Sequence, residues 1–219
     1  MLGIIFTGGN VPKAQLVKRL LETEAKGALF VAADSGLAAA LDAGVKPDWI
    51  IGDMDSLEDQ SRLSAVAQER VIRHPHDKDF TDTELAFSLA AEKGCDDIWI
   101  LGGGGGRIDH LFGIRSLFER ERFPRRWITN AEDIRCIDSK AKQNELSLKI
   151  EKGAVVSVFP LGEGQWEAKS VGLKWQLNGL RWDRGFFGLS NVAVDGDFSV
   201  TAEAGRFMVI TLLEDICQQ

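Results

Sequence analysis

The sequence predicts an α/β protein, with a doubly wound, mostly parallel α/β domain at residues 1–125 followed by an all-β sandwich at residues 126–219. In the first half, short apolar runs alternate with amphipathic segments, the pattern of a parallel sheet with helices on its faces. Polar or glycine-rich clusters follow these apolar runs, as they do where ligands bind beyond the carboxyl ends of parallel strands. In the second half, short alternating runs between turn residues are typical of a small antiparallel sandwich or barrel.

Periodicity and helix-end signals predict the elements of the first half in order. Strands are expected at residues 3–6, 29–33, 48–51, 70–73 and 97–101. Helices are expected at about residues 12–24, 37–43, 57–68, 82–93 and 107–120. Thr81 and Glu84 have the spacing of a capping box, which predicts a helix beginning at Asp82, and Gly44 and Gly94 suit the ends of two helices.

The second half reads as strands without a long helix. Strands are expected at residues 134–137, 145–150, 154–160, 164–170, 199–202 and 207–213. Trp175, between two of these segments, is by composition alone more often a core residue than a ligand contact.

Composition narrows the classes of function. The net charge of -7 argues against a general nucleic-acid-binding protein, although a metal ion could supply positive charge for a phosphorylated substrate. Cys95, Cys136 and Cys217 are widely spaced and form no C-x-x-C pair, which is typical of reduced thiols in a cytoplasmic protein. No apolar run reaches the roughly 18 residues that span a bilayer. We therefore expect a cytoplasmic protein with no nucleic-acid or membrane partner.

An acidic pair follows the third expected strand. Asp53 and Asp55 stand two residues apart between Gly52 and Ser56, and their carboxylates point the same way if the chain stays extended. Such a pair suits Mg²⁺, which takes oxygen ligands and is usually shared with substrate phosphates. The alternative is a solvated acidic turn in which Ser56 caps the next helix.

A second charged cluster occupies residues 77–79, after the fourth expected strand. The position of Asp82 is explained by the dipole of the helix it begins, but the adjacent cluster is not. Lys78 among carboxylates suits phosphate oxygens around a metal, with a surface ion pair as the alternative. His74 and His76 are expected to be loop residues, since no cysteine or third histidine stands nearby.

A run of five glycines at residues 102–106 joins the fifth expected strand to a helix. A backbone without side chains can approach an anion closely, and Arg107 adds a charged fork suited to phosphate. The run matches neither the P-loop nor the dinucleotide-binding fingerprint. A flexible linker is the alternative, but a linker would not pass directly from a strand into a helix.

Six motifs in one order closely resemble thiamine pyrophosphokinases, over nearly the whole chain. The motifs are Asp34–Gly36, Gly52–Ser56, Asp77–Asp82, Gly105–His110, Gly172–Trp175 and Ser190–Asn191. The resemblance implies an ATP-binding α/β domain, a β-sandwich, and a homodimer with thiamine bound between its subunits. It also implies Mg²⁺-dependent transfer of the β,γ-pyrophosphoryl group of ATP to the hydroxyl of thiamine, with release of AMP.

The resemblance also implies roles for individual residues. The expected catalytic acids are Asp53, Asp55, Asp82 and Asp109, of which the first three match the family's metal ligands. Residues expected to bind ATP or its phosphates are Asn10, Asp34, Ser35, Gly36, Lys78, Asp79, Gly105, Gly106 and Arg107. Residues expected to bind thiamine are Asp109, Ser190, Asn191 and, from the other subunit, Trp175. Either Asp82 or Asp109 could take the hydroxyl proton.

Two rival functions are compatible with much of this pattern. One is a pyrophosphokinase acting on a pterin alcohol, whose catalytic half is similar; residues 172–175 and 190–191 favour thiamine instead. The other is a non-catalytic sensor of nucleotide or thiamine, which would not need the full set of acids that this chain keeps.

Overall fold

The computed structural model describes residues 1–55, 60–142 and 144–216. The chain divides into two compact units: residues 1–117 with 127–130, and residues 118–126 with the chain from 131 onward. The boundary expected between residues 125 and 126 stays a prediction. Among the described residues, no helix has both the length and the apolar character needed to cross a membrane.

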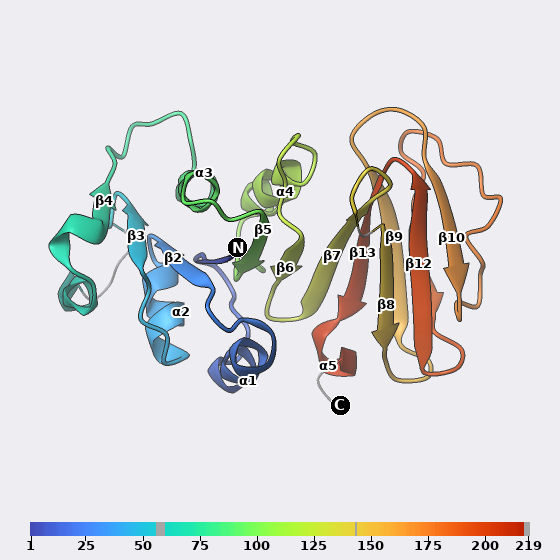
Figure 1. Cartoon of the computed structure of the whole chain (residues 1–219), viewed down its shortest axis with the longest axis horizontal. Coiled ribbons are helices and arrows are strands. Elements are labelled where there is room, and N and C mark those ends of the chain that lie inside the picture. Colours follow the sequence, from blue (N-terminus) through green and yellow to red (C-terminus); the bar gives the residue numbers. More distant parts are fainter. Residues whose placement is uncertain (56–59, 143, 217–219) are drawn as a thin grey trace. The chain divides into compact units, whose positions relative to one another are not determined.

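The first unit is built on a sheet whose strand order is β6-β5-β1-β2-β3-β4 (Figure 1). The pairs of β1 with β2 and β5, of β2 with β3, and of β3 with β4 are all parallel. The strands are β1 (Leu2–Phe6), β2 (Leu29–Ala33), β3 (Trp49–Gly52), β4 (Val71–Arg73), β5 (Asp97–Leu101) and β6 (Arg126–Ile128). Ile4, Ile5 and Val31 are completely buried in the central strands, as expected where helices cover a parallel sheet. Strand β6 was not predicted.

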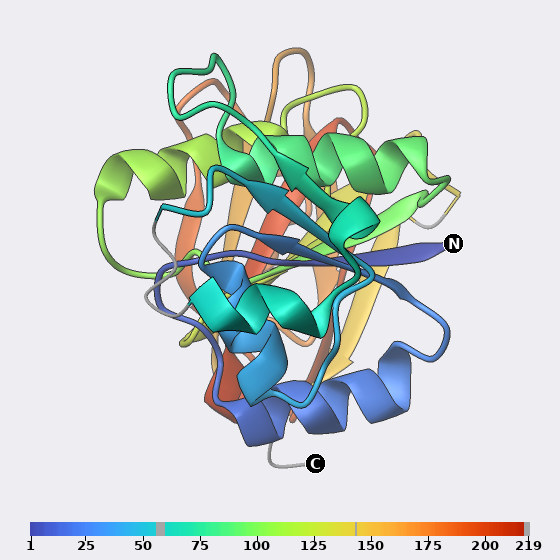
Figure 2. The ribbon, with the colours of Figure 1, turned by 90° about the vertical axis from the view of Figure 1, so that its left-hand side faces the viewer.

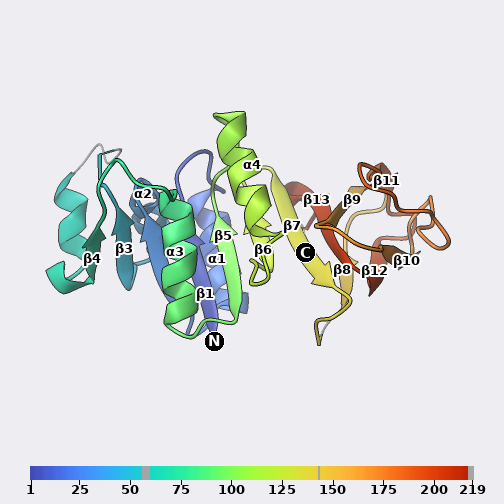
Figure 3. The same ribbon diagram turned by 90° about the horizontal axis from the view of Figure 1, so that it is seen from above.

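Four helices flank this sheet. They are α1 (Ala14–Glu24), α2 (Gly36–Asp42), α3 (Asp82–Glu92) and α4 (Ile108–Leu117). Figures 2 and 3 show α3 and α4 over one face of the sheet and α1 and α2 over the other. The capping box that predicted the start of α3 is present, with the Thr81 hydroxyl accepting from the Glu84 N–H and the Glu84 carboxylate accepting from the Thr81 N–H.

Two expected helices differ in the structure. Within the expected helix at 57–68, the described residues form 3₁₀ turns at Gln60–Ala65 and Gln68–Arg70. Leu63, within the first of these turns, and Val66, just after it, pack in the apolar core. The cap predicted at Ser56 lies outside the described residues. Helix α4 ends at Leu117 rather than at residue 120.

The second unit is antiparallel. Its strands are β7 (Glu132–Asp138), β8 (Glu145–Lys149), β9 (Val155–Leu161), β10 (Glu167–Val171), β11 (Gly188–Val192), β12 (Asp197–Ala204) and β13 (Arg206–Leu212), followed by the short helix α5 (Leu213–Ile216). They pair in the orders β11-β9-β13-β7 and β10-β12-β8. Buried side chains of both sets, among them Val158, Phe207, Ala168 and Val200, form one apolar cluster. The α/β class is therefore confirmed, while β11 and α5 were not predicted.

A buried ion network lies at one end of this second unit. The Asp133 carboxylate is completely buried and accepts two hydrogen bonds from the Arg126 guanidinium, at 2.8 and 2.7 Å, and others from Arg135. Burial alone would raise the pKa of Asp133, but the two arginines outweigh it and leave the pKa below its ordinary value.

Candidate active site

A cavity of about 600 Å³ opens in the first unit where the turns after β1, β2, β4 and β5 meet. Its position beyond the carboxyl ends of parallel strands is where such sheets bind ligands. Nine of the residues predicted for catalysis or binding line it: Asp34, Ser35, Lys78, Asp79, Asp82, Gly105, Gly106, Arg107 and Asp109. Residues spread over most of the first unit's sequence are therefore brought to one place by the sheet topology.

Lys78 joins two of the predicted metal ligands. Its Nζ lies 3.1 Å from Asp53 Oδ2 and 3.1 Å from Asp82 Oδ1. The side chains of Lys78 and Asp53 are each 13% exposed and that of Asp82 is 22% exposed, so this is not a loose surface pair. The surface ion pair considered as an alternative from the sequence is thus a largely buried charge cluster that borders the cavity.

The protein environment moves the pKa values of these three groups in different directions. Burial lowers the pKa of Lys78, but hydrogen bonds to Asp82 and Asp53 outweigh it and the pKa is raised overall. Burial raises the pKa of Asp82, and Lys78 offsets this only in part. Burial also raises the pKa of Asp53, but hydrogen bonds involving Asp55 and Lys78 lower it overall. Asp82 is therefore the better proton acceptor of the two carboxylates.

Asp34, predicted to bind ATP, lies beside these acids. It is 8% exposed, and its Oδ1 has no hydrogen-bond partner among the described residues. Single oxygens of Asp34, Asp53 and Asp82 all lie within 4.8 Å of one another. A buried carboxylate oxygen without a donor calls for a cation or water, and oxygens from three carboxylates at this spacing fit a hard divalent ion.

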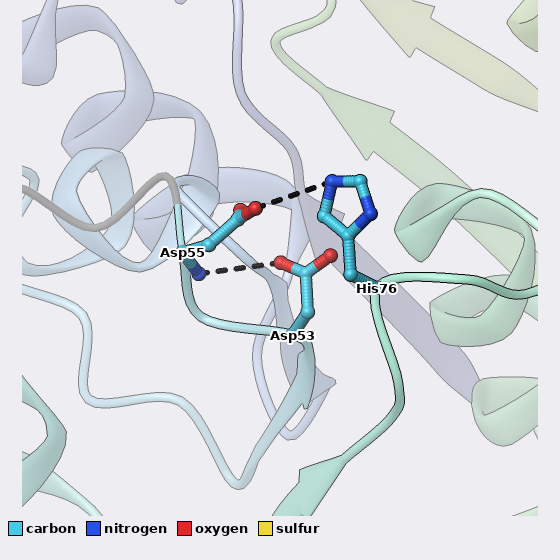
Figure 4. Close-up of side chains that lie close together, drawn as sticks. All are labelled: Asp53, Asp55 and His76. Atoms are coloured by element: carbon cyan, nitrogen blue, oxygen red, sulfur yellow. Dashed lines mark hydrogen bonds and ion pairs between the residues drawn. The ribbon is translucent and has the colours of Figure 1, made fainter.

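The chain turns at Met54, between Asp53 and Asp55. Met54 has a φ of 64° and is 1% exposed, since its side chain packs against Ile50 and Val66. The expectation of an extended chain is therefore wrong here. The Asp55 carboxylate lies 3.5 Å from His76 Nε2, and the backbone N–H of Asp55 donates to Asp53 Oδ1 at 3.2 Å (Figure 4).

His76 is a residue that sequence reasoning set aside. Ligand atoms of Asp53, Asp55 and His76 lie within 4.8 Å of one another, so the histidine stands close enough to share an ion with the two acids. The sequence signal was its place in the same loop as Lys78, at the end of a strand adjacent to β3. Parallel neighbours bring such loops together at one edge of the sheet.

Three contacts fix the start of α3, and with it Asp82. The capping box at Thr81 begins the helix. The hydroxyls of Thr7 and Thr83 form a buried hydrogen bond of 2.7 Å, which ties the end of β1 to the first turn of α3. Gly52 has a φ of 148°, and a Cβ there would lie 3.1 Å from Asp82 Oδ1. These contacts allow β3 and α3 to bring Asp53 and Asp82 together.

The five-glycine run is bound to the loop that follows β1. The Gly103 N–H donates to the Gly8 carbonyl at 2.7 Å, and Asn10 and Gly104 exchange two backbone hydrogen bonds. A Cβ on Gly103 would lie 2.3 Å from Ile114 Cδ1, and one on Gly105 would lie 2.3 Å from Asn10 Nδ2. The run is therefore not a linker, and these glycines are required for close packing of the chain.

The end of this loop faces the cavity, where its phosphate-binding role is predicted. An added Cβ on Gly106 would meet no atom, and Gly106 lines the cavity with Arg107. The Arg107 guanidinium forms an exposed ion pair with Asp109 at the start of α4, which lowers the pKa of Asp109 and raises that of Arg107. Asn10 and Gly36 do not line the cavity; a Cβ on Gly36 would lie 2.2 Å from the Phe6 carbonyl oxygen.

The residues predicted to bind thiamine through the second unit surround Trp175. Trp175 is 56% exposed, so its placement in a core is wrong. Buried Asn191 accepts from the Trp175 N–H at 3.0 Å and donates to the Trp175 carbonyl at 2.6 Å, which fixes the backbone under the indole. Ser190 has a φ of 56°, and its N–H donates to Ser157 Oγ. Asn191 therefore holds the backbone of Trp175 in place, while its predicted contact with thiamine stays a prediction.

Comparisons with known proteins agree on one family. The family model described as "Thiamin pyrophosphokinase, catalytic domain" matches residues 20–144. The thiamine pyrophosphokinase of Bacillus subtilis (strain 168) is 34% identical over 161 residues, which cover 68% of this chain and 71% of that protein.

Solved structures agree with the sequence comparisons. A crystal structure of Bacillus subtilis thiamine pyrophosphokinase superposes with a TM-score of 0.75 at 26% identity, over 96% of this chain and 98% of the other. Thiamin pyrophosphokinase from Candida albicans shares the fold, with a TM-score of 0.68 at 15% identity over 96% and 90% of the two chains.

Proposed function

The chain belongs to the thiamin pyrophosphokinase family, and we propose that it transfers the β,γ-pyrophosphoryl group of ATP to the hydroxyl of thiamine, giving thiamine diphosphate and AMP. The observation that carries the proposal is the cluster of Asp34, Asp53 and Asp82 around Lys78 at the edge of the cavity. Carboxylates for a cation and ammonium or guanidinium groups for phosphates are what a kinase of small alcohols requires.

Mg²⁺ is the proposed cofactor, held by Asp53, Asp55 and Asp82 with Asp34 as a further ligand. The orphan Oδ1 of Asp34 and the spacing of the oxygens support this assignment. When bound, such an ion neutralises charge on the phosphate oxygens that would repel the incoming hydroxyl. The chain's own contribution is to hold the carboxylates in place through the turn at Met54 and the contacts that fix α3.

ATP is proposed to lie along the cavity with its phosphates between the loops that carry Lys78 and Arg107. The ammonium, the guanidinium and the backbone N–H groups of Gly105 and Gly106 are the donors suited to phosphate oxygens there. Asp34 and Ser35 line the same cavity, and Asp79 borders it, while Asn10 and Gly36 support the loops from behind.

The hydroxyl proton is proposed to pass to Asp82 rather than to Asp109. Burial raises the pKa of Asp82, whereas the ion pair with Arg107 lowers the pKa of Asp109. In the chain without a bound cation, Asp82 is therefore the carboxylate with the higher proton affinity, which is the property that a general base needs.

Thiamine is proposed to stack on Trp175 contributed by the second subunit of a homodimer. The exposed indole already attracts one cation, since Lys174 Nζ lies 4.6 Å from its ring centroid. The thiazolium of thiamine is a cation of the kind that favours such an aromatic face. The finer description of the fold, a doubly wound first unit and a β-sandwich second unit, and a cytoplasmic location belong to the same proposal.

The proposal is tested by the choice of alcohol. The purified chain is incubated with ATP and Mg²⁺ and either thiamine or a hydroxymethylpterin, and AMP is measured by chromatography. We expect AMP with thiamine, little with the pterin, and none with thiamine for the Asp53→Asn variant. If AMP forms with the pterin and not with thiamine, the chain is a pyrophosphokinase of a pterin alcohol. If no AMP forms with either alcohol, the result favours the sensor.

A further inference from the structure

Among the described residues, Lys78 is the cation that forms ion pairs with both Asp53 and Asp82. These two acids are also the ones that the proposed metal site needs. We propose that the Lys78 ammonium is an internal competitor of the divalent cation, so that loading of the cation releases Lys78 from the two carboxylates toward the phosphate-binding cavity. This inference rests on the proposed function, because it takes the carboxylate cluster to be a divalent-cation site.

The competition follows from geometry. Lys78 Nζ lies 3.1 Å from Asp53 Oδ2 and 3.1 Å from Asp82 Oδ1. Mg²⁺ binds oxygen at about 2.1 Å, so an ion on Asp53 Oδ2 would lie no farther than about 5 Å from the ammonium. Like charges at that separation repel strongly where water is largely excluded. The Lys78 side chain is only 13% exposed, so screening by bulk water is weaker than at the surface.

The balance of charge explains why the lysine occupies this position. Asp34, Asp53 and Asp82 bring three carboxylates within 4.8 Å of one another, and the ammonium is the positive group among them. Without a cation of some kind, the carboxylates would repel one another. Lys78 therefore keeps the ligands assembled in a form that a divalent ion can take over.

The displaced side chain has a place to go. Lys78 lines the cavity together with Ser35, Gly106 and Arg107, and its four-carbon stem is unbranched and rotatable. Phosphate oxygens in the cavity would give the released ammonium a new partner. Divalent cation and phosphate then favour each other's binding, because each relieves a cost that the other incurs.

The test measures metal binding directly on the full chain, without nucleotide. Free Mn²⁺ is followed by electron paramagnetic resonance during titration of wild type, Lys78→Met and Lys18→Met. Lys18 is an exposed lysine of α1, so its variant makes the same change in net charge away from the cavity. We expect Lys78→Met to bind Mn²⁺ at least about fivefold more tightly than wild type, and Lys18→Met to match wild type within about twofold.

Equal or weaker Mn²⁺ binding by Lys78→Met would overturn the competition, as would the absence of Mn²⁺ binding in all three proteins. Thermal melting supplies an independent readout: Mn²⁺ should raise the melting temperature of Lys78→Met more than that of wild type. If Lys78→Met does not melt cooperatively, Lys78→Gln, which can still donate hydrogen bonds, is measured in its place with the same expectation.

The outcome is separable from the proposed function. Tighter Mn²⁺ binding by Lys78→Met than by wild type would support the competition even if the wild-type chain made no thiamine diphosphate, a result that would refute the function. Unchanged Mn²⁺ binding in a chain that makes thiamine diphosphate would refute the competition alone.

Discussion

Asp53 belongs to both groups of side chains in the described residues that are spaced closely enough to hold a metal ion, one with Asp34 and Asp82 and the other with Asp55 and His76. It also accepts hydrogen bonds from the Lys78 ammonium and the Asp55 N–H. A single carboxylate therefore links the buried and the exposed parts of the site, and its charge should matter more than its shape.

We expect Asp53→Asn to lower kcat by more than about 100-fold in saturating Mg²⁺, because it keeps the side-chain volume but removes one anionic ligand. Steady-state release of AMP measures the effect. Glu22→Gln, a matched loss of one exposed carboxylate on α1, should leave kcat unchanged. Wild-type turnover by Asp53→Asn would contradict the assignment of the metal site.

Trp175→Ala should raise the KM for thiamine by about tenfold, the size expected when a desolvated cation–π contact is lost. The KM for ATP should stay within about twofold, since the proposed ATP site lies in the first unit. Val171→Ala removes another exposed apolar side chain from the second unit and serves as the control. Equal increases in both KM values would show that Trp175 supports the fold rather than thiamine.

At the scale of single elements, the N-terminus of α3 carries both a helix cap and Asp82, the proposed catalytic acid. Thr81→Ala removes the hydroxyl that accepts from the Glu84 N–H. We expect it to lower the free energy of unfolding by about 1 kcal/mol, measured by urea denaturation. Thr23→Ala is the matched control, because the exposed Thr23 hydroxyl donates only to carbonyls of its own helix and should change stability by less than about 0.5 kcal/mol.

Arg126 and Asp133 form a buried ion pair within the second unit. Asp133→Asn removes the buried charge that pairs with Arg126 and Arg135 and should cost about 3 kcal/mol of unfolding free energy at neutral pH. The control Asp183→Asn breaks the exposed pair with Arg181 and should cost less than about 1 kcal/mol. Similar losses in the two variants would mean that the buried network does not stabilise the second unit.

The stabilisation by Asp133 should also depend on pH in one direction. Its pKa is lowered in the folded chain from the ordinary value of 3.8, so its contribution is present above that value. It is lost as pH falls through the lower folded-state pKa. The difference in stability between wild type and Asp133→Asn should therefore be constant near pH 7 and shrink below about pH 4, in urea melts across this range.

At the scale of the whole molecule, the sequence predicts what is local and misses what depends on distant neighbours. The capping box spans four consecutive residues from Thr81, and the predicted start of α3 at Asp82 is confirmed. The positive φ of Met54 follows from burial of its side chain beneath β3 and could not be read from the acidic pair alone. The pairing of the glycine run with the Gly8–Asn10 loop joins segments more than ninety residues apart.

The candidate site shows the same division. The sequence placed most of the cavity residues directly after predicted strands. Because parallel strands place their carboxyl ends at one edge of the sheet, these residues were expected to lie close together. The grouping of Asp34 with Asp53 and Asp82, the proposed metal ligands, was missed, since it depends on how β2, β3 and α3 pack. The short strands β6 and β11 were missed because each is defined by its partners more than by its own composition.

The central claim, transfer of a pyrophosphoryl group to thiamine, is tested most directly by the fate of the β-phosphorus of ATP. ATP carrying radioactive phosphorus at that atom is incubated with the chain, Mg²⁺ and thiamine. The products are then separated, and the radioactivity and amount of each are measured. The account predicts label in thiamine diphosphate and an equal amount of unlabelled AMP. Label retained in ADP, together with thiamine monophosphate, would contradict it.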